Sequence, residues 1–153
     1  MTTIFNEQIY DPAFPLDGPH LVAASAGTGK TYNIQNVCAR LVMERDFRIR
    51  EIQVTTFTEA ATKELRDRVR RVFANLSLLF AGRENEILDR DGKKDVREVE
   101  RLERLRECAR GNGVPDLVAR SRVEGALREF DLAAITTIHG FCSRAMKRFA
   151  FET

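Results

Sequence analysis

The chain has 153 residues, of which 43% are hydrophobic and 31% are charged, so it can bury a core and is the size of one domain. Its 25 Lys and Arg residues nearly balance its 23 Asp and Glu residues, which excludes an acidic disordered segment and a histone-like basic protein. No apolar run is long enough to span a membrane and the N-terminus lacks a signal-peptide pattern, so we expect a cytoplasmic protein with no membrane partner. The 3 cysteines are widely spaced, which favours reduced thiols over a disulfide framework or a zinc site.

The first elements alternate between strand and helix. Residues 1–19 hold three of the 4 prolines and are expected to form an extended N-terminal arm. The apolar run 20–24 predicts a short buried strand, followed by a glycine-bearing turn and a helix over 30–44. A second β-rich run, 51–58, leads into a helix that Thr58 is expected to cap and that ends at Gly82.

The segment 83–130 is expected to be a charged helical insertion. Its first part, 83–110, is the densest in charge and contains equal numbers of basic and acidic residues, which is typical of a solvated helix with many ion pairs. Its apolar residues recur every three positions and therefore drift around a helix of 3.6 residues per turn. We expect this helix to pack loosely or to contact two neighbouring elements of the fold. A third β-rich run, 132–138, and a last helix, 140–150, follow. The alternation predicts an α/β fold with a parallel sheet.

The turn after the first strand has the spacing of a phosphate-binding loop, except that its first glycine is replaced by alanine. The loop consists of Ala24, Ser25, Ala26, Gly27, Thr28, Gly29, Lys30 and Thr31. Backbone N–H groups and a helix N-terminus hold phosphate oxygens, so glycines are needed where a Cβ would block the approach. Lys30 would contact the β- and γ-phosphates and the Thr31 hydroxyl would bind Mg²⁺, which predicts nucleotide binding.

Two later strands end in similar threonine pairs. Thr55 and Thr56 close the second β-rich run, and Thr136 and Thr137 close the third. We expect both ends to open at the same sheet edge as the phosphate loop, because ligands of open α/β sheets bind at the carboxyl ends of the strands. Phe57 is either an exposed ring that stacks on a base or part of a second buried face.

Three segments together resemble the N-terminal part of superfamily 1 helicases of the UvrD/Rep type. They are HLVAASAGTGKTYNI, preceded by PLDG, then VTTFTEAATKELRDRV and AAITTIHGFCSRAM, which are similar to motifs I, Ia and Ib. The resemblance is closest to the RecB-like branch, the beta subunit of exodeoxyribonuclease V. It implies a partial P-loop RecA-like parallel sheet, the first helicase subdomain, with the helical insertion between its second and third strands. The expected divisions are the arm 1–19, the motif I and Ia part 20–82, the insertion 83–130 and the motif Ib part 131–153.

The resemblance also assigns roles to residues. Gly27, Gly29, Lys30 and Thr31 are similar to the ATP·Mg²⁺ site, with Lys30 and Thr31 as its catalytic residues. The single-stranded DNA contacts that it implies are Thr56, Phe57, Thr58 and Thr62 of motif Ia and Thr137, His139 and Phe141 of motif Ib. Gln8 is a candidate for the adenine-reading glutamine by position only.

Further expectations concern the protein that this chain would belong to. The Asp-Glu motif, the arginine fingers and the second RecA-like domain of the family have no counterpart in the 153 residues, so the chain alone should be inactive and its uncovered sheet edges should favour self-association. The full enzyme would couple ATP hydrolysis to translocation on single-stranded DNA in double-strand-break repair and recombination, with RecC-like and RecD-like partners. The alternatives are an AddA-type helicase-nuclease, a P-loop phosphotransferase and a nucleotide-binding module without enzymatic activity.

Overall fold

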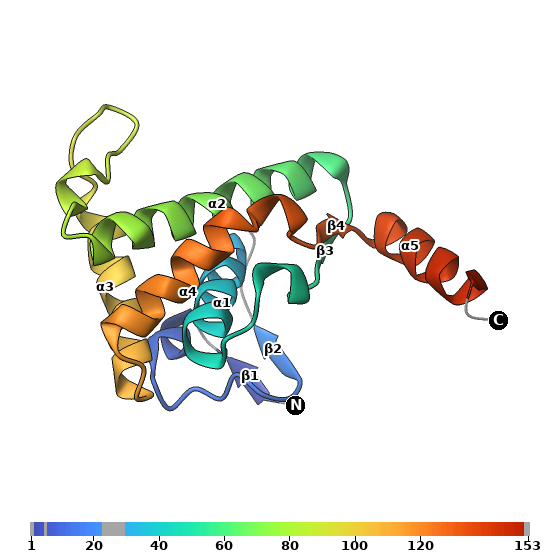
Figure 1. Cartoon of the computed structure of the whole chain (residues 1–153), viewed down its shortest axis with the longest axis horizontal. Helices are drawn as coiled ribbons and strands as arrows, with labels where there is room; N and C mark the ends of the chain where they lie inside the picture. Colours follow the sequence, from blue (N-terminus) through green and yellow to red (C-terminus); the bar gives the residue numbers. More distant parts are fainter. Residues whose placement is uncertain (1, 5, 23–29, 152–153) are drawn as a thin grey trace.

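The computed structural model describes residues 2–4, 6–22 and 30–151, which form a mixed α/β fold (Figure 1). The strands are β1 (Thr2–Ile4), β2 (His20–Val22), β3 (Val54–Thr56) and β4 (Ile135–Thr137). The α-helices are α1 (Lys30–Arg45), α2 (Glu59–Phe80), α3 (Val96–Gly111), α4 (Asp116–Arg128) and α5 (Ile138–Phe151). Short 3₁₀ helices are η1 (Asn6–Tyr10), η2 (Ile49–Glu51), η3 (Glu84–Glu86) and η4 (Phe130–Leu132).

The described strands form two separate parallel pairs instead of one sheet. β1 pairs with β2, with Thr2 opposite His20, and β3 pairs with β4, with Val54 opposite Ile135. The parallel pairing is confirmed, whereas the expectation that the three β-rich runs form one sheet is not met among the described residues. The strand β1, which the sequence did not predict, pairs with β2 in place of the later strands.

The core lies between α1, α2 and α4, each of which packs on the other two; in Figure 1, α4 passes below α2 and in front of α1. The apolar stripe predicted for α2 is buried, and Phe73 and Leu76 are fully enclosed. Helix α2 ends where the sequence predicted, because Gly82 adopts a positive φ of 71° that favours glycine. Elements of all three motif segments, namely α1, β3 and β4, therefore contact the long helix α2.

The segment 83–130 contributes much of this core. Leu102 and Leu105 of α3 and Val123 of α4 are fully buried, and α4 packs on both α1 and α2. The charged composition concealed this role, because these apolar residues are interspersed with charged residues whose ion pairs, such as Arg110–Asp116 and Arg120–Glu124, are partly exposed. At the start of α3 the drift of the apolar positions leaves Val96 exposed, while the helix as a whole contacts α1, α2 and α4.

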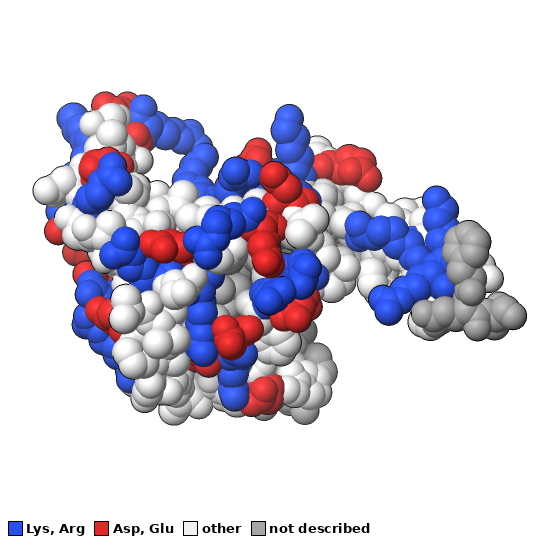
Figure 2. Space-filling model, in the orientation of Figure 1, with Lys and Arg blue, Asp and Glu red and all other residues white. Residues whose placement is uncertain are grey.

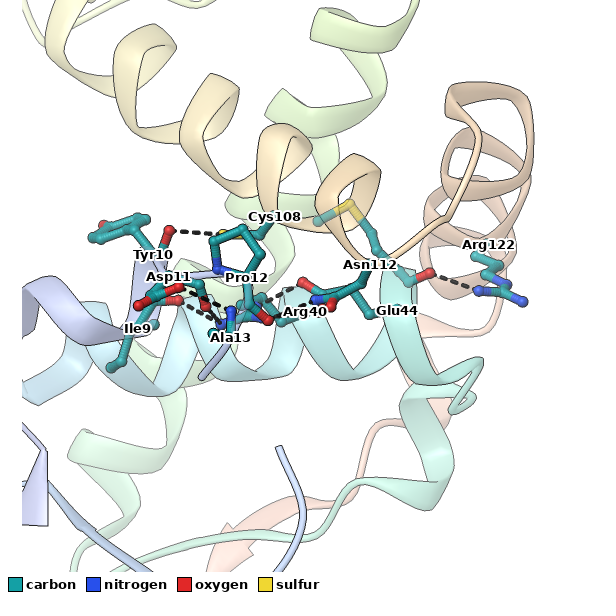
Figure 3. A network of polar contacts seen from close by, with 11 residues as sticks. Ile9, Tyr10, Asp11, Pro12, Ala13, Arg40, Glu44, Cys108, Asn112 and Arg122 are labelled. Carbon is teal, nitrogen blue, oxygen red and sulfur yellow. Dashed lines mark hydrogen bonds and ion pairs between the residues drawn. The ribbon is translucent and has the colours of Figure 1, made fainter. Parts of the chain in front are cut away.

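The N-terminal segment is folded, although we expected an extended arm. It contains β1 and η1, and Arg40 of α1 donates to the carbonyl oxygens of Ile9 at 2.7 Å and Asp11 at 3.1 Å (Figure 3). Asn112, which follows α3, donates to the carbonyl oxygen of Pro12, and the Cys108 thiol donates to that of Tyr10. These donors fix the backbone of a segment whose three prolines supply no N–H donor of their own.

Helix α5 projects from the rest of the molecule (Figure 1). Its apolar side chains Phe141, Met146 and Phe149 are exposed. Basic side chains gather on the same helix, whereas the body carries both signs intermixed (Figure 2). Among the described helices, none has the length and apolar character needed to cross a membrane.

Candidate functional site

The candidate phosphate site begins at the N-terminus of α1. Lys30 is the first residue of this helix and is exposed, and Thr31 follows it and is half-buried. The other loop residues, 24–29, lie outside the described residues. The first turn of α1 contains no acidic residue, so the positive end of the 16-residue helix is not neutralised there. An ammonium group, a hydroxyl group and this helix end fit a phosphate group with its Mg²⁺ ion.

The two threonine-rich strand ends lie side by side. In the parallel pair β3–β4, Thr55 is opposite Thr136 and Thr56 is opposite Thr137. Thr56 is half-buried and Thr137 is buried, whereas the preceding Thr55 is exposed and Thr136 is half-buried. Because side chains alternate between the two faces of a strand, Thr56 and Thr137 lie on the face of the pair that packs against α2. The structure thus brings the motif Ia and motif Ib residues together, as the sequence predicted. Whether the phosphate loop opens at the same edge stays a prediction, because the loop itself is not described.

A hydroxyl network stabilises the turn from β3 into α2. Thr58 is the N-cap of α2, and its hydroxyl accepts a hydrogen bond from the backbone N–H of Ala61 at 3.1 Å, which confirms the predicted cap. The Thr62 hydroxyl lies 2.5 Å from that of Thr56 and donates to the carbonyl oxygen of Thr58 at 3.0 Å. Thr62 is buried, so its hydroxyl holds the strand end against the helix.

The turn from β4 into α5 has a similar construction. The Thr137 hydroxyl accepts a hydrogen bond from the backbone N–H of Gly140 at 3.0 Å. A Cβ on Gly140 would lie 3.2 Å from this hydroxyl, a tight contact that a shift of a few tenths of an ångström would relieve. His139 and Phe141 of the first turn of α5 are exposed.

Phe57 stands between β3 and α2, and its side chain is 89% exposed. Of the two positions that we considered for it, the structure therefore has the exposed one. An exposed ring at a strand end offers a flat apolar surface on which a nucleic-acid base can stack.

Two arginines that the sequence did not single out as site residues support these turns. Arg66 of α2 donates to the carbonyl oxygens of Asp131 at 2.9 Å and Ala133 at 3.2 Å, just before β4. Its guanidinium also lies 5.9 Å from the centre of the Phe130 ring. Arg144 of α5 donates to the Thr136 hydroxyl at 2.9 Å. Only the tertiary structure brings these partners together, since they lie far apart or on different elements in the sequence.

The buried cysteines are unsuited to nucleophilic chemistry. Burial raises the pKa of the Cys38 thiol, on α1, from 9.0 to about 12, and burial also raises the pKa of Cys108. Both thiols therefore stay protonated at neutral pH. Cys142 of α5 is exposed.

The known proteins that are similar to this chain belong to the family that the motifs indicated. Residues 5–153 match the model of the UvrD/REP helicase N-terminal domain. The chain is 37% identical over 147 residues to the RecBCD enzyme subunit RecB of Haemophilus influenzae, and 36% identical over 149 residues to that of Escherichia coli. It is 32% identical over 145 residues to RecB of Chlamydia trachomatis.

These alignments cover 91%, 91% and 94% of the chain. They cover 11% or 12% of the relatives, so the chain spans about a tenth of the length of the curated relatives that it matches. The resemblance found in the motifs is confirmed: the chain belongs to the family of the UvrD/REP helicase N-terminal domain, in its RecB-like branch.

Proposed function

We propose that the chain is the ATP- and single-stranded-DNA-binding N-terminal part of an ATP-dependent DNA helicase and nuclease subunit that acts in double-strand-break repair and recombination. The observation that carries this proposal is the family match over residues 5–153, which includes all three motif segments. The core of the domain would be a P-loop RecA-like sheet to which β2, β3 and β4 belong. A P-loop phosphotransferase finds no support in this match, and an AddA-type helicase-nuclease remains the nearest alternative.

In this proposal, ATP and Mg²⁺ are the cofactors of the site at the start of α1. The backbone of residues 24–29 would surround the phosphates, with the Lys30 ammonium group against the β- and γ-phosphates. The Thr31 hydroxyl would be a ligand of Mg²⁺, and this ion would neutralise the charge that develops on the phosphates. The helix N-terminus of α1 adds a fixed positive partial charge that needs no rearrangement when the nucleotide binds.

Single-stranded DNA is the proposed second ligand, at the paired ends of β3 and β4. Phe57 and Phe141 supply exposed aromatic surface for bases, and His139 supplies a ring nitrogen for polar contact. The buried hydroxyls of Thr62 and Thr137 hold the two turns, and Thr56 and Thr58 complete the motif Ia side. Basic residues of α5 would attract the phosphate backbone (Figure 2).

The further roles concern the larger protein. The relatives named above are subunits of an enzyme called RecBCD, so we propose RecC-like and RecD-like partners for this protein in the cytoplasm. For the 153-residue chain alone we propose nucleotide binding without turnover, because hydrolysis also needs a metal-binding carboxylate and transition-state arginines acting together.

The test is titration of the purified chain with MgADP and, separately, with a fluorescent oligo-dT strand. The proposal predicts saturable ADP binding that Lys30→Ala abolishes. It also predicts weak DNA binding with a shallow salt dependence, because few phosphates are contacted. Folded protein that binds neither ligand would contradict the proposal.

A further inference from the structure

The inserted helix α3 reaches the helix that carries Lys30. Arg101 of α3 lies with its guanidinium carbon 5.1 Å from the centre of the Tyr32 ring, and it donates a hydrogen bond of 2.7 Å to the side-chain oxygen of Asn36. Tyr32 and Asn36 are one turn apart on the same face of α1. Tyr32 follows Lys30 by two residues, so this contact lies within the first turn of α1.

The Arg101 side chain is held by Glu98 of the same helix, and Glu98 is held in turn by α2. Its guanidinium makes two hydrogen bonds to Glu98, of 2.8 and 2.6 Å, and the two side chains are only 10% and 15% exposed. Asn75 of α2 donates to the same carboxylate at 3.2 Å. A guanidinium group held in this way loses little side-chain conformational entropy when it contacts Tyr32 and Asn36.

Asn36 continues the chain of polar contacts to the N-terminal segment. It is fully buried, and its amide group donates to the Tyr10 hydroxyl at 2.7 Å. An arginine that satisfies a fully buried amide oxygen is costly to remove, because that oxygen would be left without its donor. The start of α1 is thus held by α3, while α3 is held by α2.

We propose that Arg101 is a positioning residue of the nucleotide site: it fixes the first turns of α1, and with them Lys30 and Thr31, from the charged insertion. This inference rests on the proposed nucleotide binding. It gives the segment 83–130 a role in the site that neither its composition nor the family motifs suggest.

The test compares Arg101→Gln and Arg101→Lys with the wild-type chain, and uses Arg110→Gln as the matched control. Arg110 lies on the same helix, and its partner is Asp116 instead of α1. Three quantities are measured: amide hydrogen exchange of residues 32–36, MgADP affinity by calorimetry, and Tm by circular dichroism.

We expect Arg101→Gln to speed the exchange of these amides about tenfold and to weaken ADP binding about three- to tenfold. Arg101→Lys keeps a cation over Tyr32 and should recover part of both losses, and it decides the question alone if the glutamine variant does not fold. Arg110→Gln should match the wild type in exchange and affinity.

Unchanged exchange at residues 32–36 in the Arg101 variants would overturn the inference, and so would an equal effect of Arg110→Gln. If exchange rises in Arg101→Gln but the folded wild type binds no ADP, the positioning of α1 stands and the proposed nucleotide site fails.

Discussion

Replacing Arg40 with methionine should destabilise the chain more than any surface substitution. Arg40 is fully buried, and its guanidinium pairs with Glu44 through hydrogen bonds of 2.6 and 2.9 Å, with the Glu44 side chain only 2% exposed. The same group donates to the carbonyl oxygens of Ile9 and Asp11 (Figure 3). Methionine fills similar volume but leaves a buried carboxylate without its cation, which costs about 3–5 kcal/mol.

Urea unfolding followed by circular dichroism measures this cost, since the chain has 0 Trp residues for fluorescence. The matched control is Arg120→Met, which removes another arginine paired with a glutamate four residues later. That pair with Glu124 is 45% and 36% exposed and should cost at most about 0.5 kcal/mol.

The double substitution Arg40→Met with Glu44→Leu should recover about 2 kcal/mol of the loss, because no uncompensated charge remains. A loss below about 1 kcal/mol for Arg40→Met, or a double variant no more stable than the single one, would refute the argument from buried charge.

The remaining predictions concern exposed and titrating groups. Phe57→Ala should leave Tm unchanged, because the ring is 89% exposed, and should weaken binding of oligo-dT by about 1–3 kcal/mol; a fall in Tm with unchanged DNA affinity would show the ring to be structural. Hydrogen bonds from Arg110 and Arg106 hold the pKa of Asp116 well below its ordinary value of 3.8. Asp116→Asn should therefore cost about 0.5–1 kcal/mol at pH 7, and this difference should shrink as the pH falls below 3.8; a difference independent of pH down to pH 2 would be contrary to that reasoning. A thiol reagent should label Cys142 in the native chain and Cys38 only after unfolding, since the pKa of Cys38 is raised to about 12; rapid native labelling of Cys38, measured by mass spectrometry, would disagree with its burial.

The local elements were predictable because their signals are local. Helix α2 shows an apolar stripe, a threonine cap and a glycine stop within one stretch of sequence, and all three are present in the structure. The sequence also predicted that Thr56 and Thr137 lie at one sheet edge, since parallel strands of one sheet end at the same edge, and the structure adds that they are direct neighbours.

The long-range contacts were not predictable in the same way. The charge density of α3 is the same whether its arginines face water or, like Arg101, reach another helix. The fold of the N-terminal segment depends on donors from Arg40 and Asn112, which lie 29 and 100 residues away from their partners along the chain. The pairing of β1 with β2 likewise depends on tertiary placement, because a strand of three residues has almost no pattern of its own.

The central claim is that a nucleotide binds at the start of α1, and calorimetric titration of the wild-type chain and of Lys30→Ala with MgADP tests it most directly. Lys30 is exposed at the helix N-terminus, so its truncation should leave the fold and the Tm unchanged. The account predicts saturable binding by the wild type that is lost in the variant. Equal affinity of the two proteins, both shown to be folded by circular dichroism, would contradict it.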